Sequence, residues 1–279
     1  MSQESSFELV SLKHGIHSLR LKANREIFHP GIGPQAEANI LHVKQQRLVE
    51  RCHAASRFVI WDVGLGAAAN AIAAIEAVRD TNCEVEIHSF DSTTGALCFA
   101  LENQEALTYI APHAEALRTL LAQNFVQVAP RVKWFFHHGD FREQMMIGTI
   151  PSPNAIFYDP YSPSKNIEMW NLEHFTNLHK RLGTDTPYIV TNYTRSTVVR
   201  VTWLLAGFFV GIGSSIGDKR ETSVASNAPE LLERPLQKTW LHRVQISHSS
   251  APLEGDEYKI IPISAERFAQ LEKHAQFLT

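Results

Sequence analysis

The stretch Phe58-Val-Ile-Trp-Asp-Val-Gly-Leu-Gly-Ala-Ala-Ala-Asn70 decides the fold of this chain. Its first four residues are apolar or aromatic, as in a strand that is buried on both faces of a parallel sheet. Two glycines follow one residue apart, and the run from Ala67 to Val78 has strong helix propensity. A strand, a glycine turn and a helix in this order form a ligand site in open α/β sheets. A βα turn without a ligand has the same short pattern, so the evidence for a ligand must come from the rest of the chain.

Strands and helices alternate through the middle of the chain. The further strands that we expect cover residues 85–90, 132–136, 155–158, 188–191 and 208–212, and the helices between them cover 94–106, 112–123, 167–182 and 196–206. This alternation predicts a doubly wound, mostly parallel α/β sheet of the Rossmann-like type, with helices on both faces.

A small appendage is expected before this core. Alternating apolar residues at 7–12 and 16–21, on either side of Lys13-His14-Gly15, predict an N-terminal β-hairpin. A loop with two prolines follows at 26–34. The spacing of apolar residues at 35–53 then fits an amphipathic helix, which would bring Glu37 near the ligand.

A second appendage is expected after the core. Residues 240–247 and 258–263 have the pattern of a C-terminal β-hairpin around Glu254-Gly-Asp, and a short helix begins after Ser264 as N-cap. We find no internal repeat and no low-complexity linker. We therefore expect one domain over residues 1–279, made of an N-terminal region (1–53), a ligand-binding core (54–227) and a C-terminal extension (228–279).

Composition limits the class of protein. The 279 residues carry a formal net charge of -3, so a nucleic-acid partner would need a local basic patch. Cys52, Cys83 and Cys98 are odd in number and have no C-x-x-C spacing, which predicts reduced thiols in the cytoplasm. The N-terminus does not have the pattern of a signal peptide, and the apolar run at 203–213 is too short to span a bilayer. We expect a cytoplasmic protein with no membrane partner.

Four successive strands of the predicted sheet end in an acidic residue. These residues are Asp62, Asp91, Asp140 and Asp159. The carboxyl ends of parallel strands meet at one edge of a sheet, where ligands bind. A single aspartate at such a position is commonly a helix N-cap. Four of them beside a G-x-G turn are harder to explain by capping alone.

The electrostatics of this edge favour one ligand over another. A dinucleotide calls for a third glycine, where this chain has Ala68 and Ala69, and Asp62 before the turn would repel a pyrophosphate. S-adenosylmethionine has a cationic sulfonium, an ammonium group and no phosphate. Asp62 would receive its ammonium, Asp91 its ribose, and the region of Asp140 and Phe141 its adenine.

At two places the chain resembles a known family. The residues from Trp61 to Asn70 are similar to the cofactor motif of the class I methyltransferases. The stretch Phe157-Tyr-Asp-Pro-Tyr-Ser-Pro-Ser-Lys-Asn-Ile-Glu-Met-Trp170 resembles the signature of the MnmC-like methyltransferase domain, which completes 5-methylaminomethyl-2-thiouridine at the tRNA wobble position. The matching positions are Asp159, Pro163, Lys165, Asn166, Met169 and Trp170.

Further blocks extend the resemblance to about residues 8–225. The later blocks are Thr191-x-Tyr-Thr-Arg-Ser-Thr-Val-Val-Arg200, Ala206-Gly-Phe208 and Gly217-Asp-Lys-Arg-Glu-Thr222. Upstream, His29-Pro-Gly-x-Gly-x-x-x-Glu37 is similar to the loop and helix of stand-alone members. Two positions depart from the family, which commonly has glycine at Ala68 and proline at Ile167. The FAD-binding oxidase half of the bifunctional enzyme has no counterpart here, so the resemblance is to the stand-alone form.

The resemblance implies a reaction and a set of site residues. S-adenosylmethionine would methylate the amine of 5-aminomethyl-uridine in tRNA, with Asp159 orienting the amine and accepting its proton. The implied cofactor-binding residues are Glu37, Asp62, Gly64, Gly66, Asn70, Asp91, Asp140, Phe141 and Asp159. Tyr161 would border the uracil ring, and Lys165 and Arg220 would contact phosphates.

Other interpretations remain open. The same fold would also suit a methyltransferase for a small-molecule amine or another acceptor, in keeping with the weak net charge, or a non-catalytic module. We assign no metal site, because His137 and His138 are adjacent on a strand and point to opposite sides of the sheet.

Overall fold

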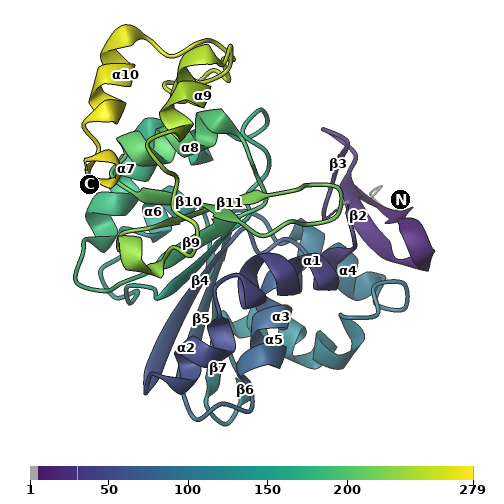
Figure 1. The fold of residues 1–279 in the computed structure, drawn as a ribbon. Helices are drawn as coiled ribbons and strands as arrows, with labels where there is room; N and C mark the ends of the chain where they lie inside the picture. Colours follow the sequence, from purple (N-terminus) through teal and green to yellow (C-terminus); the bar gives the residue numbers. More distant parts are fainter. Residues whose placement is uncertain (1–5, 30, 279) are drawn as a thin grey trace.

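The computed structural model describes residues 6–29 and 31–278. Within these residues an eight-stranded sheet has the order β10-β11-β9-β8-β4-β5-β7-β6 (Figure 1). Its strands are β4 (Arg57–Val63), β5 (Glu84–Asp91), β6 (Phe125–Ala129), β7 (Val132–His138), β8 (Ala155–Tyr158), β9 (Ile189–Asn192), β10 (Phe209–Gly213) and β11 (Thr222–Ser226). The central strands β9, β8, β4, β5 and β7 pair in parallel, whereas β6 and β11 are antiparallel to their neighbours. The predicted class, a mostly parallel sheet, is confirmed.

Helices cover both faces of the sheet (Figure 1). One layer contains α1 (Pro34–Ala38), α2 (Leu48–His53), α3 (Ala69–Val78), α4 (Gly95–Glu102) and α5 (Ala114–Gln123), and the other contains α6 (Phe141–Gln144), α7 (Leu172–Leu182) and α8 (Thr197–Leu205). Strand β4 shows why a central strand is apolar throughout. Phe58 and Ile60 pack into the first layer, while Val59, Trp61 and Val63 pack into the second.

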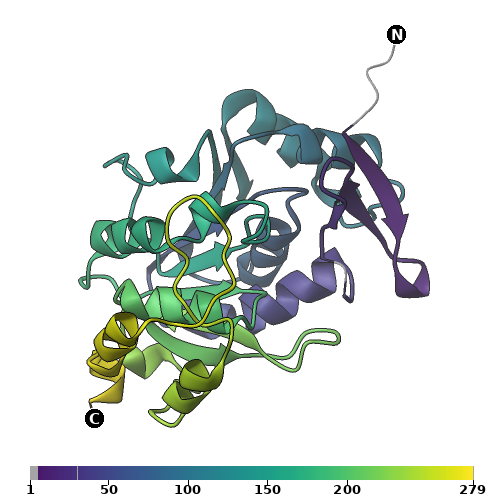
Figure 2. The ribbon, with the colours of Figure 1, turned by 90° about the horizontal axis from the view of Figure 1, so that it is seen from above.

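The predicted N-terminal hairpin is confirmed and gains a third strand. Strands β1 (Phe7–Ser11), β2 (His17–Leu21) and β3 (Glu26–Ile27) form a separate antiparallel sheet beside the main one (Figures 1 and 2). Strand β3 lies in the segment that we predicted to be a loop. It brings Glu26 and the residues after it to the carboxyl edge of the main sheet.

The helix predicted for residues 35–53 is not continuous. A π-helical segment, η2 (Asn39–Lys44), follows α1, and Arg47 has a left-handed backbone (φ 48°) before α2 begins. Buried polar contacts join this segment to the main sheet. The Gln46 side chain donates to the Ile156 carbonyl and the Thr191 hydroxyl, and His42 Nδ1 lies 2.7 Å from that same hydroxyl. The segment is thereby fixed to β8 and β9.

Two strands of the main sheet also escaped prediction. Strand β6 follows α5 directly and returns into β7 through a tight turn, and β11 has the weakly apolar sequence Thr-Ser-Val-Ala-Ser. Each strand owes its place in the sheet to the strands with which it pairs. Strand β11 pairs with β9 and β10, and β6 pairs with β7 across a short turn. Such tertiary context is not visible in a local pattern.

The predicted C-terminal β-hairpin is wrong. Residues Trp240–Ile246 form the helix α9, with Leu241 and Val244 buried at helical spacing, and Ile246 is exposed, where a strand would have buried it. Residues 258–263 have no regular structure, and both Ile260 and Ile261 face solvent. The helix after Ser264 is present as α10 (Ala265–Glu272), capped by the Ser264 hydroxyl, which accepts from the Arg267 amide.

The remaining elements are short 3-10 turns. They are η1 (Lys13–Gly15), η3 (Ala111–His113), η4 (Ile167–Met169), η5 (Pro229–Leu231) and η6 (Ala275–Phe277). No helix in the part of the chain that the structure describes is long and apolar enough to cross a membrane.

Arg200 fixes the hairpin of β10 and β11 to α8, and its removal should weaken the fold. The buried guanidinium donates to the Ser223 hydroxyl, the Thr222 carbonyl and the Glu221 carboxylate at 2.8–3.0 Å. Arg200→Met leaves these acceptors without a donor, so we expect the free energy of unfolding to fall by about 3 kcal/mol in urea titrations. The control Arg195→Met, at an exposed position, should change it by less than about 0.5 kcal/mol. An equal effect of the two substitutions would contradict this account.

Candidate active site

A cavity of about 490 Å³ opens at the carboxyl edge of β4, β5 and β8. Its size is within the range of small-molecule sites. Five segments form its wall: residues 25–29, 63–67, 90–92, 139–142 and part of 159–169. Four single residues complete the wall: Glu37, Asn70, Tyr193 and Lys219.

Most of the site residues expected from the sequence line this cavity. The lining ones are Glu37, Gly64, Gly66, Asn70, Asp91, Asp140, Phe141, Asp159 and Tyr161. Asp62, Lys165 and Arg220 do not line it. The structure adds residues that we did not single out, notably Glu26, His29, Tyr193 and Lys219. The last three stand inside blocks quoted for the family resemblance, whereas nothing in the sequence around Glu26 marks it.

The glycine turn is shaped by close backbone approach. Gly64 has φ +92°, and a Cβ atom added there would lie 2.6 Å from the carbonyl oxygen of Asp159. Only glycine tolerates both conditions. The amides of Gly64 and Leu65 donate to the Phe90 carbonyl at 3.0 and 3.1 Å, which joins the turn to the end of β5. Ala68 also has a left-handed backbone (φ 63°), which explains why the family commonly has glycine at this position.

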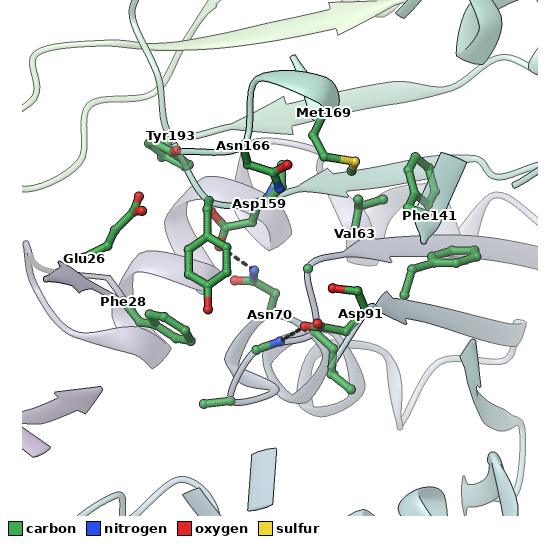
Figure 3. A pocket seen from close by; sticks show the side chains of 18 of the residues that line it. Glu26, Phe28, Val63, Asn70, Asp91, Phe141, Asp159, Asn166, Met169 and Tyr193 are labelled. Carbon is green, nitrogen blue, oxygen red and sulfur yellow. Dashed lines mark hydrogen bonds between the residues drawn. The ribbon is translucent and has the colours of Figure 1, made fainter. Parts of the chain in front are cut away.

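Asp91 is held at the end of β5 by main-chain donors. The Gly66 amide donates to its Oδ2 at 2.9 Å (Figure 3), and the Thr93 amide donates to its Oδ1 at 3.0 Å. Burial raises the pKa of this carboxyl group, and the two amide donors oppose that rise. The side chain is thus oriented into the cavity, where a ribose hydroxyl or another donor could bind to it.

Asp159 follows the end of β8 and is largely buried beside the glycine turn. Its Oδ2 accepts a hydrogen bond from the Asn70 side chain at 2.9 Å (Figure 3), and its amide donates to the Val63 carbonyl at 2.9 Å. Burial raises the pKa of the carboxyl group to about 7, against the opposing effects of Asn70 and Lys219. A carboxylate with a pKa near neutrality, at the wall of a cavity, has the properties of a general base.

Two polar atoms of the cavity wall have no partner among the described residues. They are Oδ1 of Asn70 and the hydroxyl of Tyr193. Figure 3 shows both side chains around Asp159. Buried polar groups are nearly always hydrogen-bonded in native proteins, so these two atoms are free to pair with a bound ligand or with water in the cavity.

Asp62 lies behind the cavity. It belongs to the face of β4 that carries Phe58 and Ile60, and it is fully buried, with Oδ2 accepting from the Ser89 hydroxyl at 2.7 Å. Burial raises its pKa to about 8, and its Oδ1 has no partner among the described residues. The sequence placed this carboxylate at the sheet edge, but Asp62 lies within strand β4, whose alternation puts its side chain on the buried face that carries Phe58 and Ile60.

Asp140 is a helix cap, the role that a lone aspartate often has. It accepts from the Arg142 amide at 2.8 Å at the start of α6 and forms an ion pair with the Arg142 guanidinium. This ion pair holds the pKa of the carboxyl group below its usual value. Phe141 beside it packs edge-to-face on Phe90, which also lines the cavity.

The loop after Asp159 forms a further part of the cavity wall. The Tyr161 ring packs edge-to-face on Phe28, and its carbonyl accepts from the Trp170 indole at 2.8 Å. The Ser162 amide donates to the Glu26 carboxylate at 2.9 Å, which ties this loop to the N-terminal sheet. Lys165 and Arg220 are exposed and lie outside the cavity, so any contact that they make with substrate would be at its rim.

The cavity carries more negative than positive charge. Its carboxyl groups belong to Glu26, Glu37, Asp91, Asp140, Asp159 and Glu168, and its permanent cations to Arg25, Arg142 and Lys219. A wall of this kind favours cationic ligands and disfavours a pyrophosphate.

Comparisons with known proteins agree with this geometry. Residues 109–228 match the family model described as S-adenosyl-L-methionine-dependent methyltransferase. The tRNA 5-methylaminomethyl-2-thiouridine biosynthesis bifunctional protein MnmC of Methylibium petroleiphilum is 27% identical over 223 residues, which are 77% of this chain and 34% of that protein. The same protein of Paraburkholderia phymatum is 25% identical over 90% of this chain and 40% of its own length. The chain thus spans little more than a third of the length of these relatives.

A solved structure shows the same fold. MnmC2 from Aquifex aeolicus superposes with a TM-score of 0.71 at 22% sequence identity, over 98% of this chain and 87% of its own. The class I methyltransferase fold therefore extends over nearly the whole chain, including the N-terminal sheet and the C-terminal helices.

The close approach at Gly64 provides a test of the site. Gly64→Ala places a methyl group 2.6 Å from the Asp159 carbonyl, so the turn must shift and Asn70 must separate from Asp159. We expect affinity for S-adenosyl-L-methionine, measured by calorimetry, to fall roughly tenfold or more, and stability to fall by about 1–3 kcal/mol. Gly148→Ala is the control, because nothing lies within 4 Å of a Cβ there. Wild-type affinity in Gly64→Ala would show that the turn does not contact the cofactor.

Proposed function

We propose that this chain, which is similar to the MnmC-like S-adenosyl-L-methionine-dependent methyltransferases, methylates the amine of 5-aminomethyl-2-thiouridine at the tRNA wobble position. The similar proteins of Methylibium petroleiphilum and Paraburkholderia phymatum are named for 5-methylaminomethyl-2-thiouridine biosynthesis in tRNA, which supports this acceptor. The observation that carries the proposal is Asp159, a buried carboxyl group with a pKa of about 7 at the wall of an acidic cavity. A tRNA substrate would also agree with the cytoplasmic location expected from the cysteines.

The residues present fit the cofactor. S-adenosyl-L-methionine supplies, when bound, an electrophilic methyl group on a sulfonium. Asp91 would hold the ribose, the backbone of Gly64 to Gly66 would border the cofactor closely, and Phe141 would pack on its adenine. The unpartnered Oδ1 of Asn70 would accept a hydrogen bond from its ammonium group.

The main chemical task of the protein is to free a lone pair on the acceptor. An alkylamine has a pKa near 10.4 and is mostly protonated at pH 7, so it cannot attack until a proton leaves. The Asp159 carboxylate would accept this proton and orient the nitrogen, held in place by the Asn70 amide. Tyr161 would border the uracil ring, and Lys165 and Arg220 would contact phosphates at the rim.

A direct test uses the methyl donor labelled with tritium. We expect label to enter tRNA that carries 5-aminomethyl-2-thiouridine, and to appear as the methylaminomethyl nucleoside after digestion. The matched control is the same tRNA transcribed without modification, which should remain unlabelled. If the modified tRNA also remains unlabelled while a small free amine accepts the methyl group, the acceptor is a small molecule. If the protein does not bind S-adenosyl-L-methionine at millimolar concentration, it has no methyltransferase activity.

The pH dependence of kcat/KM should follow the ionisation of the Asp159 carboxyl group. Its folded-state pKa is about 7, so the carboxylate fraction rises as pH passes through 7. We expect kcat/KM to rise up to about pH 7 and then to stay level until the acceptor amine itself titrates, near pH 10.

The variant Asp159→Asn removes this base. We expect kcat to fall by roughly 10²–10⁴-fold, with affinity for S-adenosyl-L-methionine nearly kept. The residual rate should rise steadily up to pH 9 without the break near 7, because only the free amine then reacts. Unchanged turnover, or a break that persists in the variant, would assign Asp159 a structural role.

A further inference from the structure

His29 stands between the carboxyl groups of Asp159 and Glu37. Its Nε2 lies 3.9 Å from Oδ2 of Asp159, and its Nδ1 lies 4.0 Å from Oε1 of Glu37. All three side chains are largely buried, with exposed fractions of 12% for His29, 7% for Glu37 and 15% for Asp159. The three groups form a row, Asp159, His29 and Glu37, and each of them lines the cavity.

The backbone at His29 is held in an uncommon conformation. Its φ is +48°, in the left-handed region that residues other than glycine seldom adopt. Such strain persists only where the surrounding structure enforces it, and it is concentrated at functional sites. Here it directs the imidazole into the space between the two carboxylates.

The charges around the row suit a neutral imidazole between two proton acceptors. Burial lowers the pKa of His29 and raises the pKa of Glu37. Lys219 acts on all three groups, favouring the charged form of each carboxylate, and Glu26 lies close enough to affect Asp159. A neutral imidazole can accept a proton on one nitrogen and release one from the other.

We propose that His29 and Glu37, acting through Asp159, carry the proton of the acceptor amine away from the reacting nitrogen. This inference rests on the proposed function. Asp159 first takes one proton from the acceptor ammonium group, which leaves a neutral amine. The Asp159 carboxyl proton then moves to Nε2 of His29, and the proton on Nδ1 moves to the Glu37 carboxylate. Asp159 is again a carboxylate, the imidazole is neutral in its other tautomer, and Glu37 holds the proton. After the product leaves, Glu37 gives its proton to water, and the imidazole loses its Nε2 proton to water and regains one on Nδ1, which restores the starting state.

The two distances require the row to tighten before protons move. Both exceed a hydrogen bond by about 1 Å, as is common for catalytic contacts before substrate binds. The row makes His29 and Glu37 positioning residues, and it gives Glu37 a task other than the cofactor contact expected from the sequence.

Imidazole rescue tests the relay. His29→Gly suits the positive φ and leaves a space that free imidazole can fill. We expect kcat for methyl transfer to fall by roughly 10²-fold, and added imidazole to restore it by roughly tenfold or more in a saturable manner. Affinity for S-adenosyl-L-methionine should stay within about twofold of wild type, since no cofactor contact is lost. His248→Gly, at an exposed bend, is the control and should retain wild-type turnover with or without imidazole.

Glu37→Gln separates the relay from cofactor binding. We expect kcat to fall without imidazole rescue, and affinity for the cofactor to be unchanged. If Glu37→Gln loses cofactor affinity but keeps normal kcat, Glu37 binds the cofactor and the relay is wrong. The relay is also wrong if His29→Gly has full turnover, or if imidazole does not restore its activity.

The outcome also separates this inference from the proposed function. If the wild-type protein labels tRNA and the variants have normal activity, the relay is wrong and the proposed function stands. If wild-type protein labels only a small amine, the tRNA acceptor is wrong, and the same variants measured with that amine still decide the relay. If no acceptor is labelled, both proposals fail.

Discussion

The structure depends on one close approach, between the backbone of Gly64 and that of Asp159. The ends of β4 and β8 come so near that a single methyl group at Gly64 would overlap the Asp159 carbonyl. Two hydrogen bonds hold this contact: the Asp159 amide to the Val63 carbonyl, and the Asn70 side chain to the Asp159 carboxylate. These contacts join the first residues of α3, the glycine turn and the proposed base to one another. A reaction that depends on alignment requires its groups to be positioned in this way.

Burial at this contact has an electrostatic effect that surface chemistry could not produce. An aspartate in water has a pKa near 3.9 and is a weak base at neutral pH. Removing Asp159 from water raises its pKa to about 7, and a single amide donor and a nearby lysine keep the rise from going further. On the same edge, Arg142 lowers the pKa of Asp140, whereas burial raises the pKa of Asp91 against the opposing effect of two main-chain amide donors. Similar residues at the ends of neighbouring strands thus have different properties because their immediate partners differ.

The sequence predicted the sheet because its central strands are buried on both faces and read as apolar runs, as at Phe58 to Trp61. It predicted the edge that carries Asp91, Asp140 and Asp159 because parallel strands end together. Asp62 was misplaced, because the sequence locates the end of a strand only to within one or two residues. A shift of one residue changes the face of the sheet on which a side chain lies. Prediction from the sequence also failed for α9, where Trp240 to Ile246 have a spacing that fits two structures until their packing partners are known. Glu26 was missed because its role arises from a contact across 136 residues.

That contact, between Glu26 and the Ser162 amide, gives the N-terminal sheet a part in the entrance of the cavity. A two-residue strand supplies one rim, and the loop after the proposed base supplies the other. The edge-to-face packing of Phe28 on Tyr161 and the contact of the Phe7 ring with Phe99 add to this hydrogen bond. A bulky acceptor such as a flipped nucleotide would therefore meet a boundary shared by two separate sheets, so a change in the small N-terminal sheet could alter access to the cavity without touching the core strands.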